Sequence, residues 1–178
     1  DLNDAEKSES GERPRIAATG STGKAFNPDI FFILTTGLGG YIGGHPFPQG
    51  GHAVDENGFA LQGLEFGASA AIDPYFRFDL HFELAHLHLE EAYLTTLALP
   101  GNLQARAGYF NAKFGRQNPL HLHAWSFVSP PLSQTRFMDS EAFSGPGMEW
   151  SVLLPLPWYS MVLVEMMSTS TKTGFRSS

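Results

Sequence analysis

The chain has 178 residues, 42% of them hydrophobic, which suits a single domain of ordinary size. Its formal net charge is −7, and no Lys/Arg cluster could follow a phosphate backbone, so we expect no nucleic-acid partner. The absence of cysteine excludes a disulfide framework and thiolate sites. With 15 Phe, 19 Gly and 12 Pro, the composition favours many short strands joined by turns.

The predicted elements begin after a polar lead at residues 1–26, which we expect to be disordered. Strand-like segments follow at residues 28–38, 60–72, 76–87, 89–99, 103–112, 147–155 and 158–167. They belong to a predicted strand domain at 27–167, which an irregular tail follows at 168–178. The longest apolar runs are too short for a membrane-spanning helix or contain proline, which excludes a helical membrane protein. Few segments show a helical i, i+3, i+4 stripe, so the sequence predicts an all-β chain.

The segment from Phe76 to Leu84 alternates strictly between apolar and titratable residues. Side chains on a strand point alternately to opposite faces, so one face of this segment is apolar and the other is charged. With residues of neighbouring strands, the predicted charged face consists of Glu65, Arg77, Asp79, His81, Glu83, Gln104 and Arg106. Two environments suit such a sheet: core and water in a soluble protein, or lipid and a wet lumen in a membrane barrel.

The connections between the predicted strands differ greatly in length. Three short ones lie at residues 73–75, 100–102 and 155–157, and two long ones lie at 39–58 and 113–146. If the strands run up and down in sequence, the short turns share one end of the sheet and the long loops share the other. This asymmetry is typical of outer-membrane barrels. The reversal between the third and fourth strands contains no Gly, Pro or Asn and is predicted from length alone.

Several short motifs together resemble a known family. They are Phe26-Asn27-Pro28, Ile72-Asp73-Pro74-Tyr75-Phe76, Glu90-Glu91-Ala92-Tyr93, Leu99-Pro100-Gly101, Ala107-Gly108-Tyr109-Phe110, Phe114-Gly115-Arg116-Gln117-Asn118-Pro119, His121-Leu122-His123-Ala124-Trp125-Ser126-Phe127-Val128 and Leu154-Pro155-Leu156-Pro157-Trp158. Over residues 26–165 the chain resembles a porin-like family of Gram-negative outer-membrane proteins, named zinc-regulated TonB-dependent outer-membrane receptors.

The resemblance implies an antiparallel up-and-down β-barrel in the bacterial outer membrane that passes or takes up a small solute or metal. Its partners would be outer-membrane lipid, the solute and, as an open alternative, further copies of the chain. Single-chain bacterial barrels have even strand numbers from about 8 upward, so about seven strands predict an incomplete, N-terminal portion of a barrel. The lead is too short for a plug domain, so we do not expect TonB coupling.

Two His-x-His pairs are candidate metal ligands: His86 with His88, and His121 with His123. Residues i and i+2 of a strand share a face, so two imidazoles could bind one ion such as zinc. A third ligand would come from Glu90, Glu91 or Asp139. The alternatives are placement of His86 and His88 at the membrane interface, and packing of His121 and His123 within a loop.

The long loop at 113–146 carries the apolar residues Trp125 and Phe127, with Phe137 and Phe143 further on. We expect them to anchor the loop, either as a constriction inside the barrel or as a cap on its rim.

Nothing in the chain predicts an enzyme. It has no Gly-x-Ser-x-Gly motif, and Glu90 and Glu91 occupy adjacent strand positions, which point to opposite faces. The rival to the barrel is a soluble β-sandwich or barrel acting as a binding module, with the His pairs as its metal site. The rival requires Phe66, Phe78 and Phe82 in a closed interior, with Arg77 and Glu83 outside.

Overall fold

The computed structural model describes residues 27–43, 52–54, 56–129, 131 and 142–168. The predicted disordered lead, nearly all of the predicted tail, and the predicted loop residues Phe137 and Asp139 lie outside these ranges. Within the described ranges, no helix is long and apolar enough to cross a membrane.

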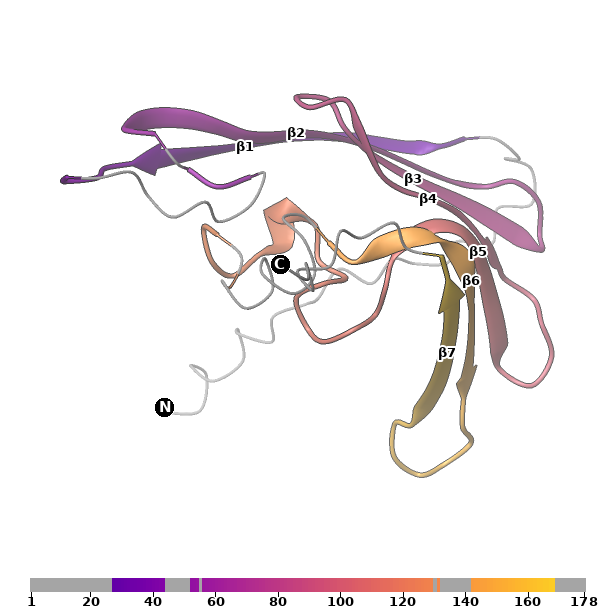
Figure 1. Ribbon diagram of the computed structural model, residues 1–178. Coiled ribbons are helices and arrows are strands. Elements are labelled where there is room, and N and C mark those ends of the chain that lie inside the picture. The colour runs from indigo at the N-terminus through magenta and orange to yellow at the C-terminus, as the bar shows by residue number, and fades with distance from the viewer. Residues whose placement is uncertain (1–26, 44–51, 55, 130, 132–141, 169–178) are drawn as a thin grey trace, which may run out of the picture.

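Seven antiparallel strands form one sheet, and each pairs with its neighbours in the sequence (Figure 1). They are β1 (Asp29–Gly39), β2 (Gly58–Ala71), β3 (Phe76–Glu83), β4 (His88–Thr96), β5 (Leu103–Asn111), β6 (Ser144–Leu153) and β7 (Met161–Met167). A short 3-10 helix, η1 (Leu122–Ala124), lies in the connection between β5 and β6. The predicted all-β, antiparallel, up-and-down order is therefore confirmed.

The three reversals that the sequence predicts to be short share one end of the sheet, and side chains shape them. The Asp73 carboxylate accepts hydrogen bonds from the backbone N–H groups of Tyr75 and Phe76, at 2.7 Å and 2.8 Å. In the next short turn, Gly101 and Asn102 have φ angles of 73° and 56°, a left-handed conformation that these two residue types tolerate.

The reversal between β3 and β4 occupies Leu84–Leu87, so β3 ends four residues before its predicted end. No glycine or proline makes this turn. The Glu83 carboxylate instead accepts hydrogen bonds from the backbone N–H groups of Leu64 and Ala85, both at 2.9 Å, and Leu87 takes a φ of 50°. A buried acidic side chain thus fixes the turn, which turn-residue composition does not reveal.

The sheet is strongly curved, and the connection that carries η1 lies inside the curve (Figure 1). We call the inner side the concave face and the outer side the convex face. Strands β1 and β7 are the edges of the sheet, which does not close on itself within the described residues. A closed barrel therefore remains a prediction.

The side chains between the sheet and its loops are mainly polar. Among the described residues the buried hydrophobic side chains are Val54, Phe110 and Ala112, whereas eleven polar or charged residues are buried, including Glu83 at 2% exposure. Phe66, Phe78 and Phe82 are only half-buried. This arrangement is the reverse of the one that the rival β-sandwich requires.

Candidate functional site on the concave face

The strand register places all seven residues of the predicted charged face on the concave face. Glu65 pairs with Glu83, Arg106 pairs with Glu149, and the remaining members follow by alternation along β2, β3 and β5. The convex face carries exposed hydrophobic side chains, such as Phe32 at 65% and Leu34 at 64%. Charged groups are therefore covered and large apolar groups are exposed, the opposite of the usual pattern in a soluble sheet.

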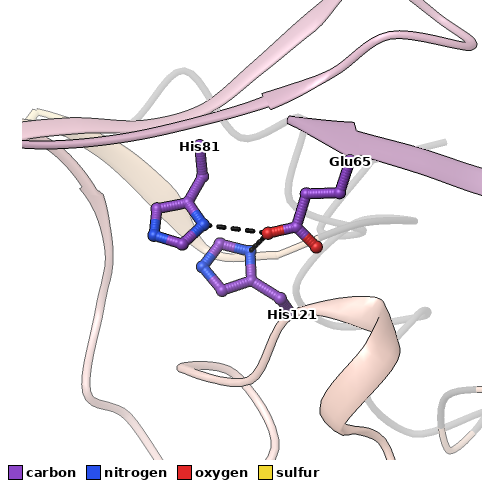
Figure 2. Close-up of side chains that lie close together, drawn as sticks. All are labelled: Glu65, His81 and His121. Carbon is purple, nitrogen blue, oxygen red and sulfur yellow. Dashed lines mark hydrogen bonds and ion pairs between the residues drawn. The ribbon is translucent and has the colours of Figure 1, made fainter. Parts of the chain in front are cut away.

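A cluster of histidines and glutamates occupies the concave face next to η1; we call it the His/Glu cluster. Its members are Glu65, His81, Glu90, Glu91, His121 and His123. Figure 2 shows three of them, with Glu65 and His81 projecting from the sheet toward His121 on the loop. Because strands β2, β3 and β4 contribute together with the β5–β6 connection, the cluster links this connection to the sheet.

Glu65 is the centre of this cluster. Its Oε1 atom lies 2.9 Å from Nδ1 of His81 and 3.9 Å from Nδ1 of His121, and its Oε2 atom lies 2.7 Å from Nδ1 of His123. The rings of His81 and His121 are nearly parallel, with centroids 4.2 Å apart. One carboxylate therefore faces three imidazoles.

His121 bridges two further carboxylates. Its Nδ1 atom lies 2.9 Å from Glu90, and its Nε2 atom lies 2.9 Å from Glu91. Burial opposes a charge on this ring, but the hydrogen bonds to Glu90 and Glu91 outweigh it and raise the pKa of His121 to about 10. Each ring nitrogen faces a carboxylate oxygen, an arrangement that an imidazolium satisfies fully because both of its nitrogens donate.

The contacts of His121 overturn the prediction that Glu90 and Glu91 point to opposite faces. His81 pairs with Glu91 and Phe82 pairs with Leu89, which leaves Glu90 as an extra, unpaired residue in a β-bulge. A bulge sets two residues of one strand against one residue of its partner and interrupts the alternation. Both carboxylates therefore reach the concave face.

The predicted metal ligands separate into two groups. His121 and His123 both reach Glu65, and their parallel rings lie 6.0 Å apart. His86 is exposed in the β3–β4 turn, with its ring 5.8 Å from that of His52. His88 begins β4 and lines a cavity of about 40 Å³ next to His121.

A group that could hold a metal ion does form, with a different membership from the predicted pairs. One ligand atom from each of Glu65, His81 and His121 lies within 4.8 Å of the others. The sequence predicted Glu65 and His81 as lining residues only. No periodicity could bring His121 to them, because a loop of the chain delivers it.

A second charged group, which the sequence predicts only in part, lies around Arg106. The Arg106 guanidinium is 2.5 Å from Glu149 and 3.9 Å from Glu165, and it lies over the rings of Tyr93 and Phe110. Lys113 is 2.8 Å from Glu149 as well. Glu149 and Ser151 alternate with apolar residues in β6, so the same alternation would have found Glu149. Glu165 is a lone acidic residue in the otherwise apolar β7, and alternation does not reveal it.

The anchors of the β5–β6 connection are mainly polar. Trp125 is half-buried and donates a hydrogen bond to the Leu120 carbonyl at 2.9 Å, whereas Phe127 is 69% exposed and does not act as the predicted anchor. The buried Asn118 amide donates to the carbonyls of Ala112 and Phe143 and accepts from the Phe143 N–H, which ties the two ends of the connection together. Amide side chains do this because they both donate and accept hydrogen bonds.

Gln62 connects the sheet to both long loops. Thr35 pairs with Gly63 and Thr36 pairs with Leu61, so Gln62 is the extra residue of a second bulge. Its side-chain amide donates to the carbonyls of His52 and Val128, at 3.0 Å and 3.1 Å. Nothing in the sequence pattern marked this residue.

No family model and no solved structure matches the chain. The resemblance to zinc-regulated TonB-dependent receptors therefore stays a prediction. The chain is similar to an uncharacterized protein of Aquifex aeolicus (strain VF5), with 31% identity over 171 residues. The match covers 85% of this chain and 36% of that protein, so the chain spans about a third of the length of this curated relative.

Proposed function

We propose that the chain forms part of a porin-like outer-membrane β-barrel that passes a small solute through a charged lumen. The observation that carries the proposal is the inversion of the sheet, with apolar side chains exposed and charged side chains covered. A lipid-facing convex side and a wet concave side account for both features at once.

The convex face supports contact with lipid rather than water. Exposed hydrophobic side chains occur on strands across the sheet, among them Phe32, Leu61, Leu94, Met148 and Val164. In water, a contiguous apolar patch of this kind marks an interaction surface or an aggregation hazard. In the hydrocarbon of a bilayer, it is the ordinary outer surface of a barrel.

The concave face supports a selective passage. Acidic groups predominate there, in the His/Glu cluster and around Arg106, and rings of acidic side chains favour cations in channels. The connection that carries η1 occupies the concavity and would narrow the passage (Figure 1). We therefore propose a small cation as the solute. Zinc is a candidate because imidazole and carboxylate are among its preferred ligands.

The rival function is a binding module in which the His/Glu cluster alone is the working site. The same cluster supports it, so the two functions differ in what contacts the convex face. In the rival that face meets a partner protein, and the protein conducts nothing.

Cysteine labelling tests the proposal directly, because the chain has no cysteine and an introduced thiol is unique within it. Leu94 and Thr95 are neighbours in β4 and point to opposite faces, so Leu94→Cys and Thr95→Cys form a matched pair. In the full-length protein in intact membranes, we expect a small water-soluble maleimide to label Thr95→Cys and a membrane-partitioning maleimide to label Leu94→Cys. Equal labelling of both thiols by the water-soluble reagent, or a protein absent from the membrane fraction, would refute the lipid-facing surface.

Conductance tests the passage itself. The full-length protein in planar bilayers should give stepwise currents, and the reversal potential in a salt gradient should indicate cation preference. A membrane-resident protein without any conductance would favour the binding module.

A further inference from the structure

We propose that Glu65, His81 and His121 bind one divalent transition-metal ion, with zinc as the best-fitting class. The inference rests on the proposed function for the role of the ion as a transported solute, while the ligand set depends only on this chain. It names the chemical class of the solute and the residues that would hold it.

The distances between the three donor atoms suit one ion. Ligands bound tetrahedrally to zinc at about 2.0 to 2.1 Å lie roughly 3.3 Å apart. The Glu65 Oε1 atom is 2.9 Å from Nδ1 of His81 and 3.9 Å from Nδ1 of His121, so the observed separations lie on either side of that value. Figure 2 shows both rings turned toward the same carboxylate oxygen. The two rings are stacked at an interplanar angle of 13°, so at least one ring must also rotate to direct its nitrogen lone pair at the shared ion.

The surroundings of His121 match those of a metal-bound histidine. Such a histidine usually binds the ion through one ring nitrogen and donates from the other to a carboxylate, which fixes its orientation. His121 offers Nδ1 toward Glu65, and its Nε2 is 2.9 Å from Glu91. The Glu91 carboxylate is itself held by the backbone N–H of Asn111 at 2.8 Å.

Glu65 has similar support, because its second oxygen accepts a hydrogen bond from His123 at 2.7 Å. The Glu90 carboxylate, which the bulge brings to Nδ1 of His121 at 2.9 Å, is placed to complete a fourth position or to compete for it. Three protein ligands with an adjacent exchangeable position distinguish catalytic zinc sites from closed structural ones. A site on a transport path needs this property.

Charge also favours a cation at this point. Glu65, Glu90 and Glu91 lie within contact of His121, and a positive charge must balance them on a covered surface. The imidazolium of His121 supplies one such charge. A divalent ion between the same carboxylates supplies two, while the histidines turn from donors of hydrogen bonds into ligands. The alternative is an ion-pair network that only fastens the loop to the sheet.

Zinc binding to the purified full-length protein, in buffer or in detergent as its solubility requires, tests the site separately from transport. We expect one equivalent of Zn²⁺ per chain by isothermal titration and elemental analysis after dialysis. Glu65→Gln, His81→Asn and His121→Asn should each weaken binding on the order of 10-fold to 100-fold. His86→Asn is the matched control, because it removes an exposed imidazole outside the group and should leave the affinity unchanged.

Circular dichroism identifies any variant that fails to fold. X-ray absorption of the zinc-loaded wild-type protein then identifies the zinc ligands without the use of variants. Two imidazole ligands at about 2.0 Å are expected. Absence of zinc binding, binding that survives all three ligand variants, or binding lost in His86→Asn would overturn the inference. If the protein binds zinc but does not conduct, the metal site is supported and the proposed transport function is refuted. If the protein conducts but does not bind zinc, the transport function is supported and the metal site is refuted.

Discussion

Arg106 makes more interactions than the other arginine and lysine side chains described on the concave face, Arg77 and Lys113. It pairs with Glu149 at 2.5 Å and approaches Glu165 at 3.9 Å, with the rings of Tyr93 and Phe110 beneath its guanidinium. The planar guanidinium suits stacking and ion pairing together, which a lysine cannot reproduce. Arg106 therefore joins β4, β5, β6 and β7 through one side chain.

Replacing Arg106 should destabilise the protein because it leaves the buried Glu149 without its main partner. We expect Arg106→Gln to lower the free energy of unfolding by about 3 kcal/mol, near the lower end for a broken buried pair since Lys113 still contacts Glu149. Urea titration of the refolded protein measures the loss. Arg116→Gln, at an exposed arginine, is the control and should cost less than about 0.5 kcal/mol. Equal effects of the two substitutions would contradict this role.

Sequence alternation was reliable for residues in regular strands and failed where the pairing itself is irregular. It placed Arg77, Asp79 and Glu83 on one face because the period of a strand is two. It misplaced Glu90, because a bulge depends on how two strands pair and leaves no periodic signal. It also missed His121 as a partner of Glu65, since a loop and not a strand brings them together.

At the scale of elements, polar side chains of the sheet hold the long connections. Gln62 binds the carbonyls of His52 and Val128, and the glutamates of the His/Glu cluster bind His121 and His123. Hydrophobic contacts contribute less, because Phe127 is exposed and few apolar side chains are buried there. The loops are thus fastened at a small number of hydrogen bonds.

Gln62→Ala should loosen both long connections together, because it removes one amide that serves two carbonyls. Loss of the donor costs roughly 1 to 3 kcal/mol at the carbonyl of the buried His52 and less at that of the exposed Val128, so local opening should increase. Limited proteolysis and hydrogen exchange near residues 52 and 128 should report it. Gln104→Ala, which removes an exposed amide whose hydrogen bond to Thr96 is long at 3.4 Å, should change neither. Faster cleavage at only one of the two loops would argue against the proposal that Gln62 holds both.

The strands themselves were predictable, and their ends were less so. All seven appear in the predicted order because alternation and turn residues agree along most of the chain. The early end of β3 was not predictable, since the Glu83 carboxylate forms the turn that glycine or proline usually signals. Part of the predicted 113–146 loop belongs to β6, which begins at Ser144.

At the scale of the molecule, the two faces of the sheet differ in which kind of side chain is exposed. Apolar side chains are exposed on the convex face and charged side chains are covered on the concave face, the reverse of the usual distribution in a water-soluble protein. Alternation and the unequal connection lengths indicated this arrangement from the sequence. The depth of the concavity and the position of η1 within it depend on tertiary contacts, which single-sequence patterns do not carry.

On the proposed lipid-facing surface, Leu94→Arg should impair membrane assembly, because Leu94 lies within β4, and the cost of an arginine rises from the interface toward about 2 to 4 kcal/mol at the bilayer midplane. Leu97→Arg is the matched control. Leu97 has similar exposure, 47% against 40%, but lies just beyond β4 in a short turn, where the cost falls to about 0 to 1 kcal/mol. Insertion into liposomes, followed by urea titration, compares the two. In a water-soluble protein both substitutions would be nearly neutral, and that result would count against the lipid-facing surface.

The two bulges allow one residue to be deleted from a strand without moving the other side chains to the opposite face of the sheet. Neither Glu90 nor Gln62 has a partner in the register, so deleting either one leaves every other side chain on its present face. Removal of Ala107 from the regular strand β5 would instead send either Arg106 or Phe110 to the opposite side. We expect the Glu90 deletion to keep its strand content by circular dichroism and the Ala107 deletion to lose it. Each bulge is therefore equivalent to the insertion of one polar residue into a regular strand, at the position where that residue contacts a loop.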